Sequence, residues 1–224
     1  MRVSSLKGMI SRAALTPWAV RTELIRLITH PVVALILGLR GVRIAKGVRF
    51  YGMPIVQRWR GSHIELGQGV QLRSSLMSNP LVPNHPVVLA TRSSHARISI
   101  GNQTGLTGTT IVAASAVDIG ARVSIGANVV VVDTDFHPLT PELRRNSPNA
   151  GVSIPVAIED DVFIGMSSLI LKGVHIGRGS VIGAGSVVTR NIPELVVAAG
   201  NPAQIISHLD NDERRAAAAS HSLG

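Results

Sequence analysis

The sequence of 224 residues contains no cysteine and very few aromatic residues. The absence of cysteine excludes disulfides, cysteine-ligated zinc, iron–sulfur clusters and a thiol nucleophile. Aromatic residues make up only 3% of the chain, which leaves too few rings for a surface that stacks nucleic-acid bases. We therefore expect no nucleic-acid partner, and we expect a core built from Val, Ile, Leu and Ala.

Long hydrophobic runs are also absent. The longest is Val32–Leu39, whereas a helix that spans a membrane needs about 20 mostly apolar residues, so we expect no transmembrane segment. Residues 17–39 have a helical pattern that contains Pro31. Arg40 and Arg43 follow the apolar run and no small-residue cleavage site is evident, an order that argues against a signal peptide.

Acidic residues are nearly absent from the first 60 positions. Residues 1–60 hold 11 Lys or Arg and one acid, Glu23, for a net charge of +10. Residues 61–224 hold 11 Lys or Arg and 12 Asp or Glu, for a net charge of −1. Two interpretations stay open: the helix at 17–39 covers the end of the fold, or residues 1–60 rest on an anionic membrane surface. We expect a cytoplasmic protein, which in the second case associates with the cytoplasmic face of a membrane.

Aliphatic residues recur every six positions, and this repeat is the main signal in the sequence. The clearest series is Ile158, Ile164, Ile170, Ile176, Ile182 and Val188. The same unit occurs upstream at Ile100, Leu106 and Val112, and then one residue out of step at Ile119, Ile125 and Val131. A weaker version covers residues 44–50 and 66–72.

A period of six fits neither a helix nor a plain strand, but it fits a coil with three flat sides. Each side is a short strand, three sides close one turn, and stacked turns bury a continuous aliphatic stripe. The pattern therefore predicts an all-β parallel β-helix. We expect a basic helical segment at 1–40, the β-helix at 41–193 with a protruding loop at 133–155, a strand or helix extension at 194–209, and a flexible tail at 210–224.

Two motifs within residues 98–206 resemble the hexapeptide-repeat acyltransferases, and in particular the sugar and polysaccharide O-acetyltransferases of the maltose, galactoside and nodulation-factor type. One motif is Asp133–Pro138 (DTDFHP). The other runs from Val162 through Ile182–Thr189 (IGAGSVVT) to Ala199–Ala203 (AGNPA). The resemblance implies a left-handed β-helix, a homotrimer, acetyl-CoA as the acyl donor, and a role in polysaccharide biosynthesis with a sugar or glycan acceptor.

The repeat breaks between Asp133 and Pro155, and His137 stands at the start of this break. Loops that leave a regular scaffold often carry function, and a histidine is the natural base for removing a hydroxyl proton near neutral pH. The resemblance likewise assigns His137 as the general base. Asp133 and Asp135 flank it, and either orients the ring or binds a sugar hydroxyl. The alternative for Asp133 is that it caps the departing loop.

The resemblance also implies a donor site and a further acceptor contact. The positions that match the family's coenzyme A contacts are Met166, Ala184, Thr189 and Arg190, of which Arg190 suits a phosphate. Where some sugar acetyltransferases have an acceptor-binding asparagine on the coil before the loop, this chain offers Leu106 or Thr107, of which Thr107 has a hydroxyl that can bond the acceptor. We expect direct transfer of the acetyl group, with a backbone N–H at the oxyanion, since the chain has neither cysteine nor a Gly-x-Ser-x-Gly motif.

Other classes of function remain open. Zinc carbonic anhydrases share the β-helix but need three histidines, and His137 with His175 does not make that set, so we expect no metal. His175 is expected to point outward from a regular coil. The remaining alternatives are an amino-sugar N-acetyltransferase and a non-catalytic scaffold subunit.

Overall fold

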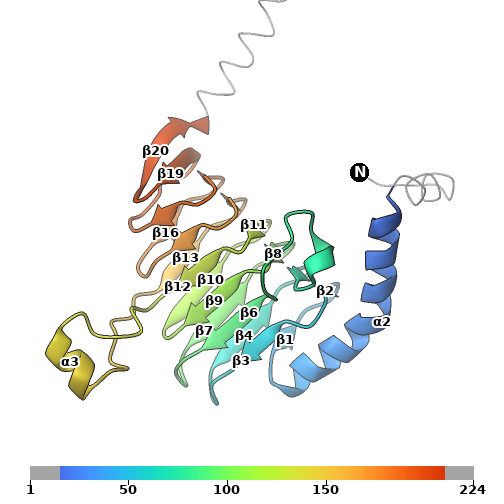
Figure 1. Ribbon diagram of the computed structural model, residues 1–224, viewed down its shortest axis with the longest axis horizontal. Coiled ribbons are helices and arrows are strands. Elements are labelled where there is room, and N and C mark those ends of the chain that lie inside the picture. The colour runs from blue at the N-terminus through green and yellow to red at the C-terminus, as the bar shows by residue number, and fades with distance from the viewer. Residues whose placement is uncertain (1–15, 210–224) are drawn as a thin grey trace, which may run out of the picture.

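The computed structural model describes residues 16–209, which begin with the long helix α2 (Pro17–Leu39) and continue as a β-helix (Figure 1). The strands form three sheets, which we call A, B and C, and the chain visits them in that order six times. Sheet A contains β1 (Arg43–Ile44), β4 (His63–Leu66), β7 (Arg97–Ile100), β10 (Ala116–Ile119), β13 (Val156–Ile158) and β16 (His175–Ile176). Sheet C contains β3 (Ile55–Gln57), β6 (Val88–Thr91), β9 (Thr110–Ala113), β12 (Val130–Val132), β15 (Leu169–Ile170) and β18 (Val187–Val188).

Sheet B is the largest of the three and includes the C-terminal strands. Its members are β2 (Arg49–Tyr51), β5 (Gln71–Arg73), β8 (Gly105–Thr107), β11 (Ser124–Ala127), β14 (Phe163–Ile164), β17 (Val181–Ile182), β19 (Val196–Gly200) and β20 (Ala203–His208). All strand pairs are parallel except β19 with β20, so the extension expected at 194–209 consists of two antiparallel strands. The tail expected at 210–224 lies outside the described residues.

The six-residue frame predicted from the sequence is the core of the β-helix. Every residue of the series from Ile158 to Val188 is buried, and so are Ile119, Ile125 and Val131. Val112 was wrongly placed in the frame: it is only partly buried, and Ile111 takes the core position opposite Val131.

The shift of the core position from Val112 to Ile111 comes from the lengths of the two corners beside β9. The corner before β9 is one residue shorter than the repeat, and the corner after it is two residues longer, since Ile111 and Ile119 are eight positions apart instead of six. The frame therefore resumes one residue out of step.

The corners between sheets form three edges, which we call AB, BC and CA. Edge AB keeps nearly the same length in every coil. Two insertions interrupt the other edges: residues 74–87, with the 3-10 helix η1 (Leu76–Ser78), leave at edge BC, and residues 133–155, with α3 (Pro141–Asn146), leave at edge CA. The second insertion stands away from the coils as an arm (Figure 1).

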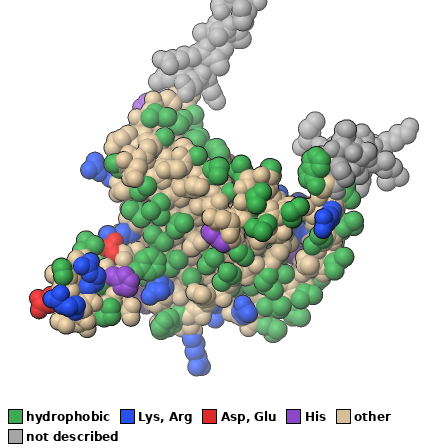
Figure 2. Space-filling view, viewed as in Figure 1, with side chains coloured by type: hydrophobic (Ala, Val, Ile, Leu, Met, Phe, Trp, Pro, Cys, Tyr) green, Lys and Arg blue, Asp and Glu red, His purple; other side chains and the backbone are tan. Residues whose placement is uncertain are grey.

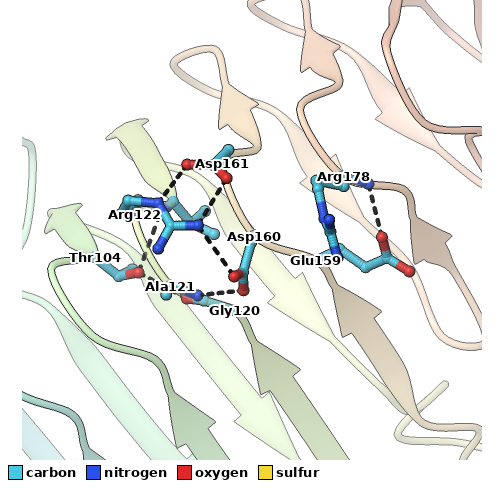
Figure 3. A network of polar contacts seen from close by, with 9 residues as sticks. Thr104, Gly120, Ala121, Arg122, Glu159, Asp160, Asp161 and Arg178 are labelled. Atoms are coloured by element: carbon cyan, nitrogen blue, oxygen red, sulfur yellow. Dashed lines mark hydrogen bonds and ion pairs between the residues drawn. The ribbon is translucent and has the colours of Figure 1, made fainter.

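Edge AB is held by backbone geometry and ion pairs (Figure 3). At the same corner position of successive coils the residue has positive φ, as at Gly47, Gly69, Gln103, Arg122, Asp161 and Gly179. From Gly69 onward, each of these residues donates its N–H to a carbonyl of the preceding coil, at 2.7–3.1 Å. The Arg122 guanidinium also bonds the carboxylates of Asp161 at 2.6 Å and Asp160 at 3.2 Å.

The helix α2 runs beside the first coils and packs on β2. Its inward side buries Val33 and Leu37 and stacks His30 on Phe50 at 5.5 Å, so it does cover the N-terminal end of the core. Burial, together with the charge of Arg26, lowers the pKa of His30, which keeps its ring neutral at neutral pH.

The composition of α2 corrects one expectation from the sequence. Residues Trp18–Leu39 form a helix of 22 residues with a mean hydropathy of 1.6, which is long and apolar enough to cross a membrane by length and composition. The estimate from the longest uninterrupted apolar run missed this, because Arg21, Glu23 and Arg26 break the run without lowering the average enough. Only 11% of this segment is buried.

Candidate active site

The arm at 133–155 leaves and re-enters edge CA through a short antiparallel stem. Thr134 and Ser153 form a bridge, and the Ile154 N–H donates to the Asp133 carbonyl at 2.8 Å. Gly151 lies where the returning chain passes closest to the outgoing one. A Cβ there would lie 2.7 Å from the His137 backbone nitrogen, so only glycine fits without a shift. The stem thus fixes the backbone on which His137 is carried.

His137 is exposed, and one ring nitrogen is held by the arm itself. Its Nδ1 lies 2.6 Å from the Pro148 carbonyl oxygen. A carbonyl can only accept a hydrogen bond, so Nδ1 carries the proton and the lone pair is on Nε2. In this tautomer Nε2 can accept a proton from a hydroxyl, which is the arrangement that a general base needs.

Two basic side chains, one from an earlier coil and one from a later coil, flank the base of the arm. Lys172 pairs with Asp135, with Nζ 3.0 Å from Oδ1, and the Arg92 guanidinium lies 5.4 Å from the centre of the Phe136 ring. Both come from corners of edge CA. Sequence reasoning missed them, because the insertion hides which corners become neighbours in space. It also missed the Pro148 carbonyl as a partner of His137, since every residue has a backbone carbonyl and a motif cannot show which one accepts a hydrogen bond.

Asp133 is fully buried beneath the arm. Its two carboxylate oxygens accept hydrogen bonds from the backbone N–H groups of Ala114 and Ser115, both at 2.7 Å. Burial raises the pKa of the Asp133 carboxyl, although these backbone hydrogen bonds act against the rise. The geometry is that of a cap on the lengthened corner at 114–115, and it favours the structural alternative over a contact with a sugar.

The residues that matched coenzyme A contacts lie on two different edges. Thr189 and Arg190 are exposed on edge CA, after β18, two corners beyond the start of the arm. Met166 and Ala184 lie on edge BC, where the Gly185 N–H donates to the Met166 carbonyl at 2.8 Å. Sheet C separates the two edges, so within one chain His137 shares an edge with Arg190 but not with Ala184.

The small residues on edge BC are needed for the stacking of coils. A Cβ on Gly126 would lie 2.6 Å from the Met166 nitrogen, and a Cβ on Gly165 would lie 2.5 Å from the Ala184 nitrogen. The structure therefore supports the packing role of this edge directly, while the coenzyme contacts stay predictions. Thr107, also on edge BC, is buried and accepts a hydrogen bond from Asn79 at 3.4 Å.

His175 points outward, as its place in a regular coil predicts. It is exposed, and its Nε2 lies 2.9 Å from a carboxylate oxygen of Glu159. Between residues 16 and 209, no group of three or more His, Asp or Glu side chains is placed to hold a metal ion.

Comparison with known proteins agrees with this arrangement. Residues 155–190 match the family described as the hexapeptide repeat of succinyl-transferase. The galactoside O-acetyltransferase of Escherichia coli is 44% identical over 105 residues, which cover 47% of this chain and 50% of that protein. The chain spans about half the length, or less, of the curated relatives it matches.

Two solved structures extend the likeness to the fold. A hexapeptide-repeat acetyltransferase from Vibrio cholerae, solved with acetyl-CoA, has a TM-score of 0.52 and 28% identity over 67% of this chain and 72% of that chain. The Bacillus cereus N-acyltransferase AntD has a TM-score of 0.60 over 82% of this chain and 96% of that chain, and at 16% identity it shows the fold alone.

The fold is therefore a left-handed parallel β-helix of hexapeptide repeats, as predicted. The resemblance to the hexapeptide-repeat acyltransferases is confirmed, and the relatives of this β-helix include the galactoside O-acetyltransferases.

Proposed function

We propose that the chain is an acetyltransferase that moves an acetyl group from acetyl-CoA to a hydroxyl of a sugar or glycan, with His137 as the general base, in polysaccharide biosynthesis. The observation that carries the proposal is the 2.6 Å contact from Nδ1 of His137 to the Pro148 carbonyl, which leaves Nε2 as a free acceptor. The likeness to galactoside O-acetyltransferases supports the choice of a sugar hydroxyl over other acceptors.

The geometry supports a direct transfer. His137 Nε2 takes the proton of the acceptor hydroxyl as its oxygen attacks the thioester carbonyl, and the imidazolium that forms keeps its Nδ1–H bond to Pro148. A backbone N–H stabilises the negative charge that develops on the carbonyl oxygen. The carbon–sulfur bond then breaks, and the proton on Nε2 passes to the departing sulfur. The products are the acetyl ester and a free thiol.

The residues on edge CA suit the donor. Acetyl-CoA supplies an activated acyl group and an anionic nucleotide end. Arg190 and Thr189 are exposed on the edge that carries the arm, so the guanidinium of Arg190 is free to meet a phosphate. Successive coils are about 4.8 Å apart. Two coils thus place Arg190 roughly 10 Å along the edge from the start of the arm, a distance that an extended pantetheine chain can cross.

The proposal includes a homotrimer. The arm exposes apolar side chains that its own chain does not cover, namely Leu139, Leu143 and Val152. The two sets of predicted donor contacts also lie on separate edges, which is what a site shared between neighbouring copies requires. Cyclic packing of three prisms would bring edge CA of one copy to edge BC of the next and complete three equivalent sites.

The test is to incubate the full chain with acetyl-CoA and a set of hydroxyl and amino sugars, and to follow the release of free thiol. Because the protein has no cysteine, the thiol reagent reports coenzyme alone. Release with a galactoside or another hydroxyl acceptor supports the proposal. Release with amino sugars alone would make the chain an N-acetyltransferase. Binding of acetyl-CoA without turnover on any acceptor would favour a scaffold subunit.

A mixing experiment tests the shared site. Ala184→Tyr would block edge BC, and His137→Ala would remove the base from edge CA. If the site is shared, mixed trimers of these two inactive variants contain some sites free of both changes, and activity returns in part. If each chain holds a whole site, the mixture stays inactive.

A further inference from the structure

The helix α2 turns polar side chains inward over its first part, up to His30, and buries the apolar Val33 and Leu37 only near its end. Its inward side carries Thr22, Glu23, Arg26 and His30 toward the β-helix. Its outward side exposes nine large apolar side chains: Trp18, Val20, Leu24, Ile25, Leu27, Ile28, Val32, Leu35 and Leu39. Hydrophobic side chains accordingly gather along the outer side of α2 in the space-filling view (Figure 2). A helix that only covers the end of a core has its apolar stripe facing inward along its whole length and a polar outer side.

The chain around α2 carries exposed charges of one sign, apart from Glu65, which lies 4.0 Å from Arg43. Between residues 16 and 60 the exposed charged residues are all basic: Arg21, Arg40, Arg43, Lys46, Arg49 and Arg60. The single acid, Glu23, is held on the inward side, where it accepts hydrogen bonds from Arg26 at 2.6 Å and from the Tyr51 hydroxyl at 2.7 Å. A large apolar face with a basic surround is the signature of a helix that lies in the headgroup region of an anionic membrane.

The inward contacts decide between lying on a membrane and crossing it. To cross, α2 would have to leave β2, break the bonds of Glu23 to Arg26 and Tyr51, and carry those charges into hydrocarbon. When α2 lies flat, it keeps these contacts, since only the outward side enters the lipid. Pairing this face with a second copy would instead bring two clusters of arginine together.

We propose that the outward face of α2 docks the protein on a membrane that contains anionic lipids, with the helix parallel to the surface and still packed on the β-helix. The apolar side chains enter the interface, and the exposed arginines pair with lipid phosphates. This role is independent of the acetyl transfer, because its residues belong to the first coils and to no part of the arm.

The experiment is sedimentation of the full chain with phosphatidylcholine vesicles, with and without 30% phosphatidylglycerol, at low and high salt. We expect binding to the anionic vesicles at low salt, and a loss of at least about tenfold in affinity at high salt, because the arginine contacts are screened. A double variant, Ile28→Ser with Leu35→Ser, should weaken binding at least about tenfold through lost apolar contact. The matched control is Ile206→Ser, an equally exposed isoleucine on β20.

A second readout reports the depth of the helix. The chain has two tryptophans, so in a Trp59→Phe variant the fluorescence comes from Trp18 on the outward face. Its emission should shift to shorter wavelength when anionic vesicles are added, and the shift should reverse with salt.

Three results would overturn the proposal. The first is a protein that stays in the supernatant with anionic vesicles at low salt. The second is binding that only detergent reverses, which would show a spanning helix. The third is a loss of oligomers in light scattering, without any vesicle binding, when Ile28 and Leu35 are changed, which would make the face a contact between copies.

Discussion

Edges AB and CA are built from the same repeat, yet they differ in regularity and in what their polar groups do. On edge AB the corners keep nearly one length, and Arg122 donates hydrogen bonds to Asp160 and Asp161 of the next coil. On edge CA the corner lengths vary, an arm leaves, and His137 and Arg190 face solvent. The contrast leads us to expect chemistry where the repeat fails and stability where the repeat holds.

The strongest test of this contrast compares two exposed histidines. His137→Ala should lower acetyl transfer by about 10²–10⁴, the usual share of general acid–base catalysis, with the melting temperature unchanged. His175→Ala, on sheet A, should leave turnover near that of the wild type. The measurement is the initial rate of thiol release at saturating acetyl-CoA. Equal rates for the two variants would show that the arm takes no part in the reaction.

The next test concerns edge BC, where neighbouring coils also pack closely. In Gly165→Ala the new Cβ would lie 2.5 Å from the Ala184 nitrogen, so the backbone of one coil must shift. We expect a loss of about 1–3 kcal/mol in the free energy of unfolding, as for other overpacked cores. Gly105→Ala is the control, since no atom lies within 4 Å of its Cβ position. Similar denaturant midpoints for both variants would contradict tight stacking at this edge.

Much of the fold could be predicted from the sequence, because a strict period leaves few ways to bury its aliphatic residues. The series from Ile158 to Val188 is buried throughout. The six-residue frame failed at Val112, because the corner before β9 is shorter than the repeat and the corner after it is longer. The Asp133 carboxylate holds this longer corner by accepting hydrogen bonds from two of its backbone N–H groups. No periodicity contains that information, because it depends on contacts between coils.

The candidate site was predicted only in part. His137 stood out because it lies where the repeat breaks, and the structure adds the bond to Pro148 that sets its tautomer. Lys172 and Arg92 could not be assigned, since an insertion of variable length decides which corners meet. The exposed apolar side of α2 also escaped notice, because the sequence pattern shows that one side of the helix differs from the other but not which side faces the core.

Asp133 gives a smaller, pH-dependent prediction at the base of the arm. Asp133→Asn leaves one backbone N–H without an acceptor and should cost about 1 kcal/mol at neutral pH. Burial raises the pKa of this carboxyl in the folded state, so the folded protein binds more protons than the unfolded chain. Its contribution to stability is then full below the unfolded pKa and declines as pH rises through the folded pKa.

The Asn side chain does not titrate, so the advantage of the wild type over the variant should be larger in acid than at neutral pH. Urea unfolding of both proteins across the acid range measures this difference, and Glu194→Gln, at an exposed carboxylate, serves as the surface control. A wild-type advantage in unfolding free energy that grows as pH rises would contradict a raised pKa of Asp133 in the folded protein.

The smallest expected effect lies at edge AB and depends on two opposing changes at Arg122. Its side chain bonds Asp160 and Asp161 on the surface, where ion pairs contribute little and salt weakens them. Its backbone has φ 57°, a left-handed conformation that glycine adopts more easily than any other residue. Arg122→Ala loses the ion pairs and keeps the backbone strain, whereas Arg122→Gly loses the ion pairs and relieves the strain.

We therefore expect the glycine variant to have a higher melting temperature than the alanine variant. The difference in melting temperature between the alanine variant and the wild type should narrow in 1 M salt. Both variants should transfer acetyl groups at the wild-type rate, since no part of edge AB meets the arm. An alanine variant as stable as the glycine variant would show that the corner is not strained and that edge AB owes its regularity to the ion pairs alone.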